Sequence, residues 1–132
     1  MKTLLFIPFL FMSCIISFRQ QTYNSDSIVG TPIRIGNLEV AQNDFPNQMN
    51  WSEAKRACIE LGSGWRLPTI DELNLICKNK DKIGGFAINS FIYWSSMEDG
   101  SVIAWRKQIS KGVPFKISKS SGLSVRAVRT IN

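Results

Sequence analysis

The 132-residue chain contains no histidine. Histidine is the side chain whose ordinary pKa best suits proton transfer near neutral pH, and it is the commonest metal ligand in proteins. Its absence excludes a Ser-His-Asp triad, a Cys-His nucleophile pair and every metal site that uses imidazole. An enzyme with this sequence would have to work with carboxylates, amines or thiols alone.

Cysteine is scarce, with only Cys14, Cys58 and Cys77 in the chain. Two cysteines cannot complete a structural zinc site without further ligands. Without histidine, neither Cys58 nor Cys77 has the partner that most often activates a thiol nucleophile. The sequence carries no recognisable motif for a metal ion, a cofactor or a specific nucleic acid.

The longest apolar run, residues 4–18, is short. A membrane-spanning helix needs about 20 residues, and Pro8 disfavours a stable helix here. A basic Lys2 followed by an apolar stretch is typical of an export signal. The segment Phe11-Met12-Ser13-Cys14 resembles the lipobox of bacterial lipoproteins, which predicts a lipid on Cys14. The alternative is an ordinary secretory signal that is removed together with Cys14.

These features divide the chain into three parts. Residues 1–14 form a predicted lipoprotein-type signal peptide, and residues 15–31 are predicted to be a flexible tether because they are largely polar and lack periodicity. Residues 32–132 are long enough for one domain with one core. We expect an exported protein that a lipid holds at the membrane of the cell envelope, with a soluble secreted form as the alternative.

Acidic residues are missing from the last quarter of the chain, where none follows Asp99. The net charge of the whole chain is +6. A basic segment of this kind can attract polyanions; the alternative is a solvated strand face whose charge is balanced elsewhere. The bases after Asp99 are Arg106, Lys107, Lys111, Lys116, Lys119, Arg126 and Arg129.

Apolar periodicity predicts one strand region, two helices and a run of antiparallel strands. Residues 32–41 alternate around a Gly36-Asn37 turn. Apolar spacings of three and four predict helices over 51–61 and from 70 to about 80, with Gly62 ending the first. A period of two then predicts strands over 91–96, 101–109, 114–118 and 123–129. This order predicts an α+β fold.

The stretch "GSGWRLPTIDEL", residues 62–73, joins the two predicted helices. Asp71 and Glu72 are adjacent, so on a helix they point about 100° apart and do not form a catalytic pair. Both lie in the first turn of the predicted helix, where the dipole favours negative charge. Glu72 also completes a predicted capping box with Thr69, as Glu53 does with Asn50. We expect Arg66 to brace the loop through carbonyls or Glu72. The predicted structural residues are Asn50, Trp51, Trp65, Arg66, Pro68, Thr69 and Glu72.

Several segments together resemble a known bacterial family. "MNWSEAKRACIELGSGWRLPTIDELNLI", "KIGGFA", "YWSS", "AW" and the final "VRAVR" are similar to the Lcl C-terminal domain, found at the C-terminus of collagen-like adhesins. The similarity runs from about Ile35 to Arg129. It implies a C-type-lectin-like fold, in which two helices pack beside a twisted antiparallel sheet with the first and last strands adjacent. That fold is also similar to the formylglycine-generating enzyme group.

The resemblance also shows what is missing. The Glu-Pro-Asn or Gln-Pro-Asp and Trp-Asn-Asp triplets of calcium-dependent lectins do not occur, and no late pair of reactive cysteines is present. The usual lectin disulfide would join Cys58 to the position of Ala127, so it cannot form. Cys58 and Cys77 lie on predicted buried helix faces, and either a disulfide between them or two inert thiols is expected.

Three functions remain. The first is a non-catalytic binding or adhesion module for a glycan, polyanion or surface protein, with its ligand-facing region within residues 93–116. A sugar would stack on Trp94 or Trp105, although core packing is the alternative for both. The second is a structural subunit of an envelope assembly. The third is an enzyme using Asp71, Glu72, Glu98 or Asp99, which rests on fold analogy. Candidate anion-binding residues are Arg106, Lys107 and Lys116.

Overall fold

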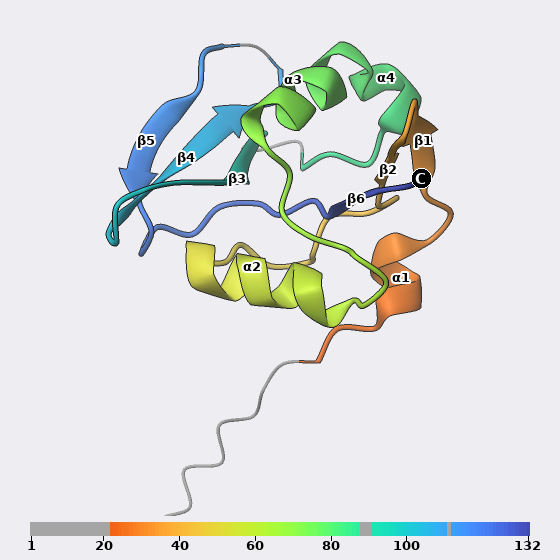
Figure 1. The fold of residues 1–132 in the computed structure, drawn as a ribbon, viewed down its shortest axis with the longest axis horizontal. Coiled ribbons are helices and arrows are strands. Elements are labelled where there is room, and N and C mark those ends of the chain that lie inside the picture. The colour runs from red at the N-terminus through yellow and green to blue at the C-terminus, as the bar shows by residue number, and fades with distance from the viewer. Residues whose placement is uncertain (1–21, 88–90, 111) are drawn as a thin grey trace, which may run out of the picture.

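The computed structural model describes residues 22–87, 91–110 and 112–132 (Figure 1). The predicted signal peptide and the predicted lipidation site Cys14 lie outside these residues. The helices are α1 (Ser25–Val29), α2 (Trp51–Glu60), α3 (Ile70–Lys78) and α4 (Lys80–Ile83). The strands are β1 (Ile33–Ile35), β2 (Leu38–Val40), β3 (Ile92–Asp99), β4 (Ile103–Gln108), β5 (Phe115–Ser118) and β6 (Val128–Thr130).

The strands form two antiparallel three-stranded sheets, in the orders β1-β2-β6 and β3-β4-β5. The α+β prediction is confirmed, and the first strand region lies beside the last, since β2 pairs with β6. The predicted final strand, 123–129, is mostly irregular because residues 123 and 124 make only single bridges, to Met49 and Tyr93. The bridge between Ser124 and Tyr93 joins this segment to β3.

Both predicted capping boxes are present. The Asn50 side chain accepts the Glu53 amide at 2.9 Å, and the Asn50 amide donates to Glu53 at 3.3 Å. Thr69 and Glu72 make the same exchange at the start of α3. Gly62 follows α2 with φ of +77°, a conformation that glycine adopts without steric cost. Helix starts are therefore encoded locally, as the sequence predicts.

The folded part begins earlier than predicted. Helix α1 is capped by Asn24 and places Ile28 at 4% exposure in the core, with Tyr23 and Val29 packed against it. The tether predicted for residues 15–31 is therefore wrong for residues 23–31. A single turn of helix gives too little apolar periodicity to be distinguished from a polar linker.

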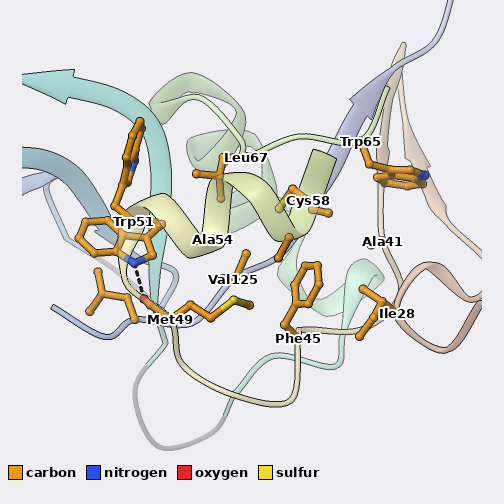
Figure 2. Close-up of a cluster of buried hydrophobic side chains, with 14 of the residues drawn as sticks. Ile28, Ala41, Phe45, Met49, Trp51, Ala54, Cys58, Trp65, Leu67 and Val125 are labelled. Atoms are coloured by element: carbon orange, nitrogen blue, oxygen red, sulfur yellow. Dashed lines mark hydrogen bonds between the residues drawn. The ribbon is translucent and has the colours of Figure 1, made fainter. Parts of the chain in front are cut away.

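The core consists of two clusters. The larger one lies under α2 and contains Phe45, Trp51, Trp65 and Trp94 (Figure 2). The smaller one lies under α3, around Leu73, Ile76, Tyr93 and Ile109. In the larger cluster, the indole N–H of Trp51 donates to Ser95 O at 2.9 Å. The indole N–H of Trp94 donates to Met49 O at 2.8 Å, so both rings are satisfied inside the core.

No helix in the described part of the chain is long and apolar enough to cross a membrane.

Candidate functional site

A groove of about 600 Å³ lies between the start of α3 and the β3-β4-β5 sheet. The first turn of α3 forms one wall. Trp105 of β4, Met97 of β3 and Pro114 before β5 form the other. Its lining is Thr69, Ile70, Asp71, Ser96, Met97, Trp105 and Pro114. Apolar walls with a few polar groups at the rim are the usual composition of a ligand site.

Trp105 is the aromatic side chain of the groove. It is partly exposed, and the Lys116 ammonium lies over its ring at 5.2 Å from the centroid. Lys116 pairs with Asp99 at 2.6 Å, so its charge is neutralised locally. Lys116 covers one face of the indole, and the rest of the ring borders the groove. Trp105 is therefore available to a ligand, and Lys116 is a neighbour of the site rather than a free anion-binding group.

The wall of the groove on α3 is held by Arg66. Its guanidinium forms two hydrogen bonds with the Glu72 carboxylate, at 2.6 and 2.8 Å, and a third with Thr130 Oγ1 at 2.8 Å. Partial burial acts to raise the pKa of Glu72, but the hydrogen bonds and charge of Arg66 and the bonds from Thr69 outweigh it, so the pKa lies below its usual value. The predicted bracing role of Arg66 is confirmed.

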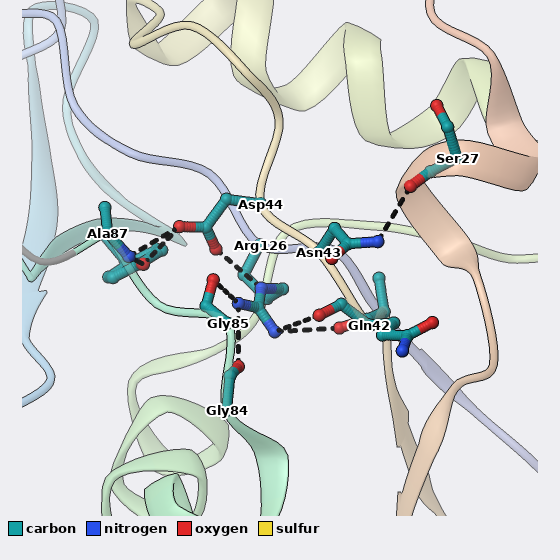
Figure 3. A network of polar contacts seen from close by, with 10 residues as sticks. Ser27, Gln42, Asn43, Asp44, Gly84, Gly85, Ala87 and Arg126 are labelled. Atoms are coloured by element: carbon teal, nitrogen blue, oxygen red, sulfur yellow. Dashed lines mark hydrogen bonds and ion pairs between the residues drawn. The ribbon is translucent and has the colours of Figure 1, made fainter.

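Asp44 and Arg126 form a second polar centre, which is buried (Figure 3). Arg126 is 1% exposed, and its Nε donates to Asp44 at 2.6 Å. The Tyr93 hydroxyl donates to the other Asp44 oxygen at 2.5 Å. The four remaining N–H groups of Arg126 donate to the carbonyl oxygens of Ala41, Gln42, Gly84 and Gly85.

This buried centre has no capacity left for a substrate. All five N–H groups of Arg126 are used, and Asp44 accepts from Arg126, Tyr93 and the Ala87 amide. Burial, and then the Asp44 charge, raise the pKa of Tyr93 well above its usual value, so the phenol remains protonated. The network ties residues 84–87 to the segment after β2 through hydrogen bonds, so its role is structural. The sequence did not indicate it, because its partners are 82 and 49 residues apart.

The four carboxylates considered for catalysis do not share a pocket. Asp71 is exposed at the groove, and Glu72 is bound to Arg66. Glu98 and Asp99 are exposed and pair with Lys119 and Lys116, each at 2.6 Å. The described residues contain no group of three or more histidine, cysteine, aspartate or glutamate side chains that could hold a metal ion.

Three of the predicted ligand-binding residues belong elsewhere. Trp94 is fully buried and packs in the core, so it cannot stack on a sugar. Lys107 is 5% exposed, and its ammonium donates to Gly112 O at 2.7 Å, so it holds the loop before β5. The Arg106 guanidinium lies over the Phe115 ring at 5.3 Å. Strand alternation accounts for Trp94, which lies on the opposite face of the sheet from Trp105; Lys107 shares the face of Trp105, and what buries it is its contact with Gly112.

Cys58 and Cys77 are both free thiols. Cys58 lies in the larger core cluster, where burial raises the pKa of its thiol far above the usual value. The Cys77 thiol donates to Ile109 O at 2.7 Å, on the α3 side of the molecule. Of the two expected states, a Cys58–Cys77 disulfide or two thiols, the structure has the thiols: Cys58 is buried in the larger cluster, whereas Cys77 is partly exposed.

A family comparison agrees with this geometry. The model of the Lcl C-terminal domain matches residues 23–129. The chain belongs to the Lcl C-terminal domain family. The match begins at Tyr23, which agrees with the structure in placing α1 inside the domain. No curated protein sequence matches the chain significantly.

Two solved structures show the fold of this Lcl C-terminal domain. One is EMS16, an antagonist of the collagen receptor integrin alpha2beta1, with a TM-score of 0.58 and 14% identity over 75% of this chain and 96% of that one. The other is the complex of a mutant von Willebrand factor A1 domain with botrocetin. Its TM-score is 0.54, with 10% identity over 75% of this chain and 95% of that one. The fold is C-type-lectin-like, as the sequence resemblance predicts.

Sequence reasoning found Trp105 and missed most of the groove around it. Met97 follows the predicted strand 91–96 and has no predicted role, Pro114 begins the predicted strand 114–118, and Thr69 is predicted only as a helix cap. A bulge between Trp94 and Glu98 shifts the register of β3, and such bulges re-aim side chains. The one local signal was the polar "SS" of "YWSS" interrupting the apolar strand.

Proposed function

We propose that this Lcl C-terminal domain is a non-catalytic binding module that takes its ligand in the Trp105 groove. The ligand we propose is a glycan. A sugar ring presents an apolar C–H face, which suits the indole of Trp105 and the apolar wall of Met97 and Pro114. It also presents hydroxyl groups, which suit Asp71 and Ser96 at the rim. The partly exposed indole of Trp105, which borders the groove, is the observation that carries the proposal.

The distribution of charge supports binding rather than catalysis. A general acid and base need two carboxylates, or an equivalent pair, facing one substrate. Of the acids at or near the groove, Glu72 is bound to Arg66, Asp99 to Lys116, and only Asp71 forms no ion pair. The charge centre with the deepest burial, Arg126 with Asp44, is saturated by internal partners. A polyanion is less well supported at the groove, since Lys116 is neutralised and Lys107 is buried.

We also propose that the module is exported and held at the membrane by a lipid on Cys14. The motif at residues 11–14 supports this. Thr22 lies beside the C-terminal end of α2, near Ala57 and Leu61, whereas α3 lies on the opposite side of the molecule (Figure 1). The segment between Cys14 and Thr22 can reach at most about 29 Å. An anchored domain would therefore hold its groove away from its own bilayer.

A glycan array tests the binding function. Residues 22–132 of the wild type should bind a subset of glycans that Trp105→Ala does not, because the variant removes the stacking surface. Lys55→Ala, on the exposed face of α2, is the matched control and should retain the wild-type pattern. Glycan binding that survives Trp105→Ala would show that the groove is not the site. An array with no bound glycan would remove the glycan assignment.

One observation favours a second candidate, a structural subunit of an envelope assembly. Among the described residues, four of the five exposed large apolar side chains lie on or beside the β3-β4-β5 sheet: Met97, Val102, Val113 and Phe115. Clustered apolar side chains commonly mark protein interfaces. Affinity purification from membranes would then recover one partner in stoichiometric amount, and its loss in Phe115→Ser but not in Trp105→Ala would identify the sheet as the interface.

A further inference from the structure

The cations of the described residues fall into groups by partner. Six are within ion-pair distance of a carboxylate: Arg56, Arg66, Lys116, Lys119, Arg126 and Arg129. Two lie over an aromatic ring and are in no ion pair: Lys55 over Trp51 and Arg106 over Phe115. Lys107 is buried on a carbonyl oxygen. Arg34, Lys78, Lys80 and Lys82 have neither a carboxylate nor a ring among the described residues.

These four cations come from adjoining elements, because α4 follows α3 directly and contacts β1, and we call the surface that they form the basic corner. Lys82 Nζ lies 3.5 Å from the Arg34 carbonyl oxygen, so α4 contacts β1 there. Lys80 Nζ lies 3.4 Å from Ser110 O. Both contacts are at the limit of hydrogen-bond length and use neutral acceptors, so the charges stay unneutralised. All four side chains belong to exposed residues.

Helix electrostatics explain only part of this cluster. Lys78 lies in the last turn of α3, where a positive charge is favoured. Lys80 and Lys82 follow the break at Asn79, on a helix of four residues, and Arg34 lies on a different element. Asp81 is the single acid on α4, and it pairs with none of them. Arg34 likewise donates only to a neutral acceptor, from Nε to Gly36 O at 2.9 Å. The basic corner therefore carries an excess of positive charge with no carboxylate partner among the described residues.

We propose that the basic corner docks on the surface of a bilayer that contains anionic lipids. Lysine, which supplies three of its four charges, is a compact point charge suited to diffuse attraction rather than to a forked, shaped contact. Clustered basic residues adsorb to anionic headgroups in this way. None of the exposed large apolar side chains in the part of the chain that the structure describes belongs to the corner, so the contact is electrostatic and does not insert.

The basic corner and the start of the described chain lie on opposite sides of the domain. In Figure 1, α4 lies on the opposite side of the domain from α2, and Thr22 lies beside the C-terminal end of α2. A domain anchored through its N-terminus, as proposed above, would present the basic corner to a second membrane. The docking itself does not depend on the anchor or on the groove, so it can be tested without either.

Sedimentation with lipid vesicles tests the docking. The test protein is residues 22–132, which contain every described element and both core clusters, with a cooperative urea transition as the check of folding. Vesicles of phosphatidylcholine alone are compared with vesicles containing 30 mol% phosphatidylglycerol, at low salt and at about tenfold higher salt. We expect binding only to the anionic vesicles, with loss at high salt because the charges are screened.

Matched double variants separate the corner from net charge. Lys80→Gln with Lys82→Gln should lower the vesicle partition coefficient roughly 25-fold, since each cation contributes about fivefold. Lys55→Gln with Arg56→Gln removes the same charge from α2 and should leave partitioning nearly unchanged. Equal losses in both doubles, or no preference for anionic vesicles, would overturn the proposal. So would retention on heparin beads that depends on Lys80 and Lys82 while vesicle binding does not, since the corner would then serve a soluble polyanion.

Discussion

Trp94 and Trp105 lie on neighbouring strands of one sheet, but they differ in burial. Trp94 is completely buried, and its indole N–H is bonded to Met49 O. Trp105 is partly exposed, borders an open groove and has Lys116 over its ring. Both look alike in sequence, as aromatic residues in alternating strands. The difference is the face of the sheet: one faces the core under α2, and the other faces the gap beside the start of α3.

The same contrast holds for charge. Arg126 and Asp44 form a closed centre in which every guanidinium N–H has a partner. Asp71, at the groove, forms no ion pair and is exposed. A group whose bonds are all satisfied internally stabilises the fold, whereas a group left open at a concave surface is available to a ligand. This distinction assigns residues to structure or to binding where residue type does not.

Removing the Arg126 guanidinium should have the largest effect. Arg126→Met leaves Asp44 largely buried without its counter-charge, so we expect the free energy of unfolding to fall by about 3–5 kcal/mol. Arg56→Met, which breaks an exposed pair on α2, should cost less than about 1 kcal/mol. Urea unfolding of both variants measures this, and equal losses would contradict the closed centre.

The two tryptophans should separate next. Trp94→Ala opens a cavity in the core and should cost about 3–5 kcal/mol. Trp105→Ala removes a partly exposed ring and should cost no more than about 2 kcal/mol while abolishing glycan binding. Thermal or urea unfolding gives the first difference and the array gives the second. A Trp105→Ala protein as unstable as Trp94→Ala would place Trp105 in the core.

The Arg66–Glu72 pair should show a smaller, pH-dependent effect. Because the folded pKa of Glu72 lies below its usual value of 4.5, the pair stabilises the fold above that pH, and this contribution is lost as pH falls through the folded pKa. Arg66→Met should cost about 1 kcal/mol at pH 7, since solvent partly screens the pair. Urea unfolding at pH 7, 4 and 3 should show the cost shrinking with acid. A cost independent of pH would exclude the ion pair as its source.

The thiols should show the smallest effect, on reactivity alone. The raised pKa of Cys58 and its burial predict that it does not react with a disulfide reagent at pH 8 until the protein unfolds. The thiol count of residues 22–132 should therefore rise on adding urea, and reduction should not change the intact mass. A two-dalton shift on reduction would instead place a bridge between Cys58 and Cys77.

The sequence predicts local features well and distant ones poorly. Both capping boxes and the Arg66 brace follow from residues within six positions of each other. The α1 segment, the clip between Arg126 and Asp44, and the groove around Trp105 depend on segments brought together by the fold. The burial of Trp94 and Lys107 also depends on tertiary structure. The alternation of side chains along a strand assigns residues to two faces of the sheet, but it does not say which face the rest of the protein covers.

The claim that binding resides in the open groove, and not in the closed core, has a direct test in the four indole N–H signals. Residues 22–132 labelled with ¹⁵N would be titrated with a glycan selected from the array, and the indole region of the NMR spectrum followed. We predict a saturable shift of the Trp105 signal, assigned from Trp105→Phe, while the core-bonded Trp51 and Trp94 signals stay in place. A Trp105 signal that does not move while the glycan binds would contradict the account.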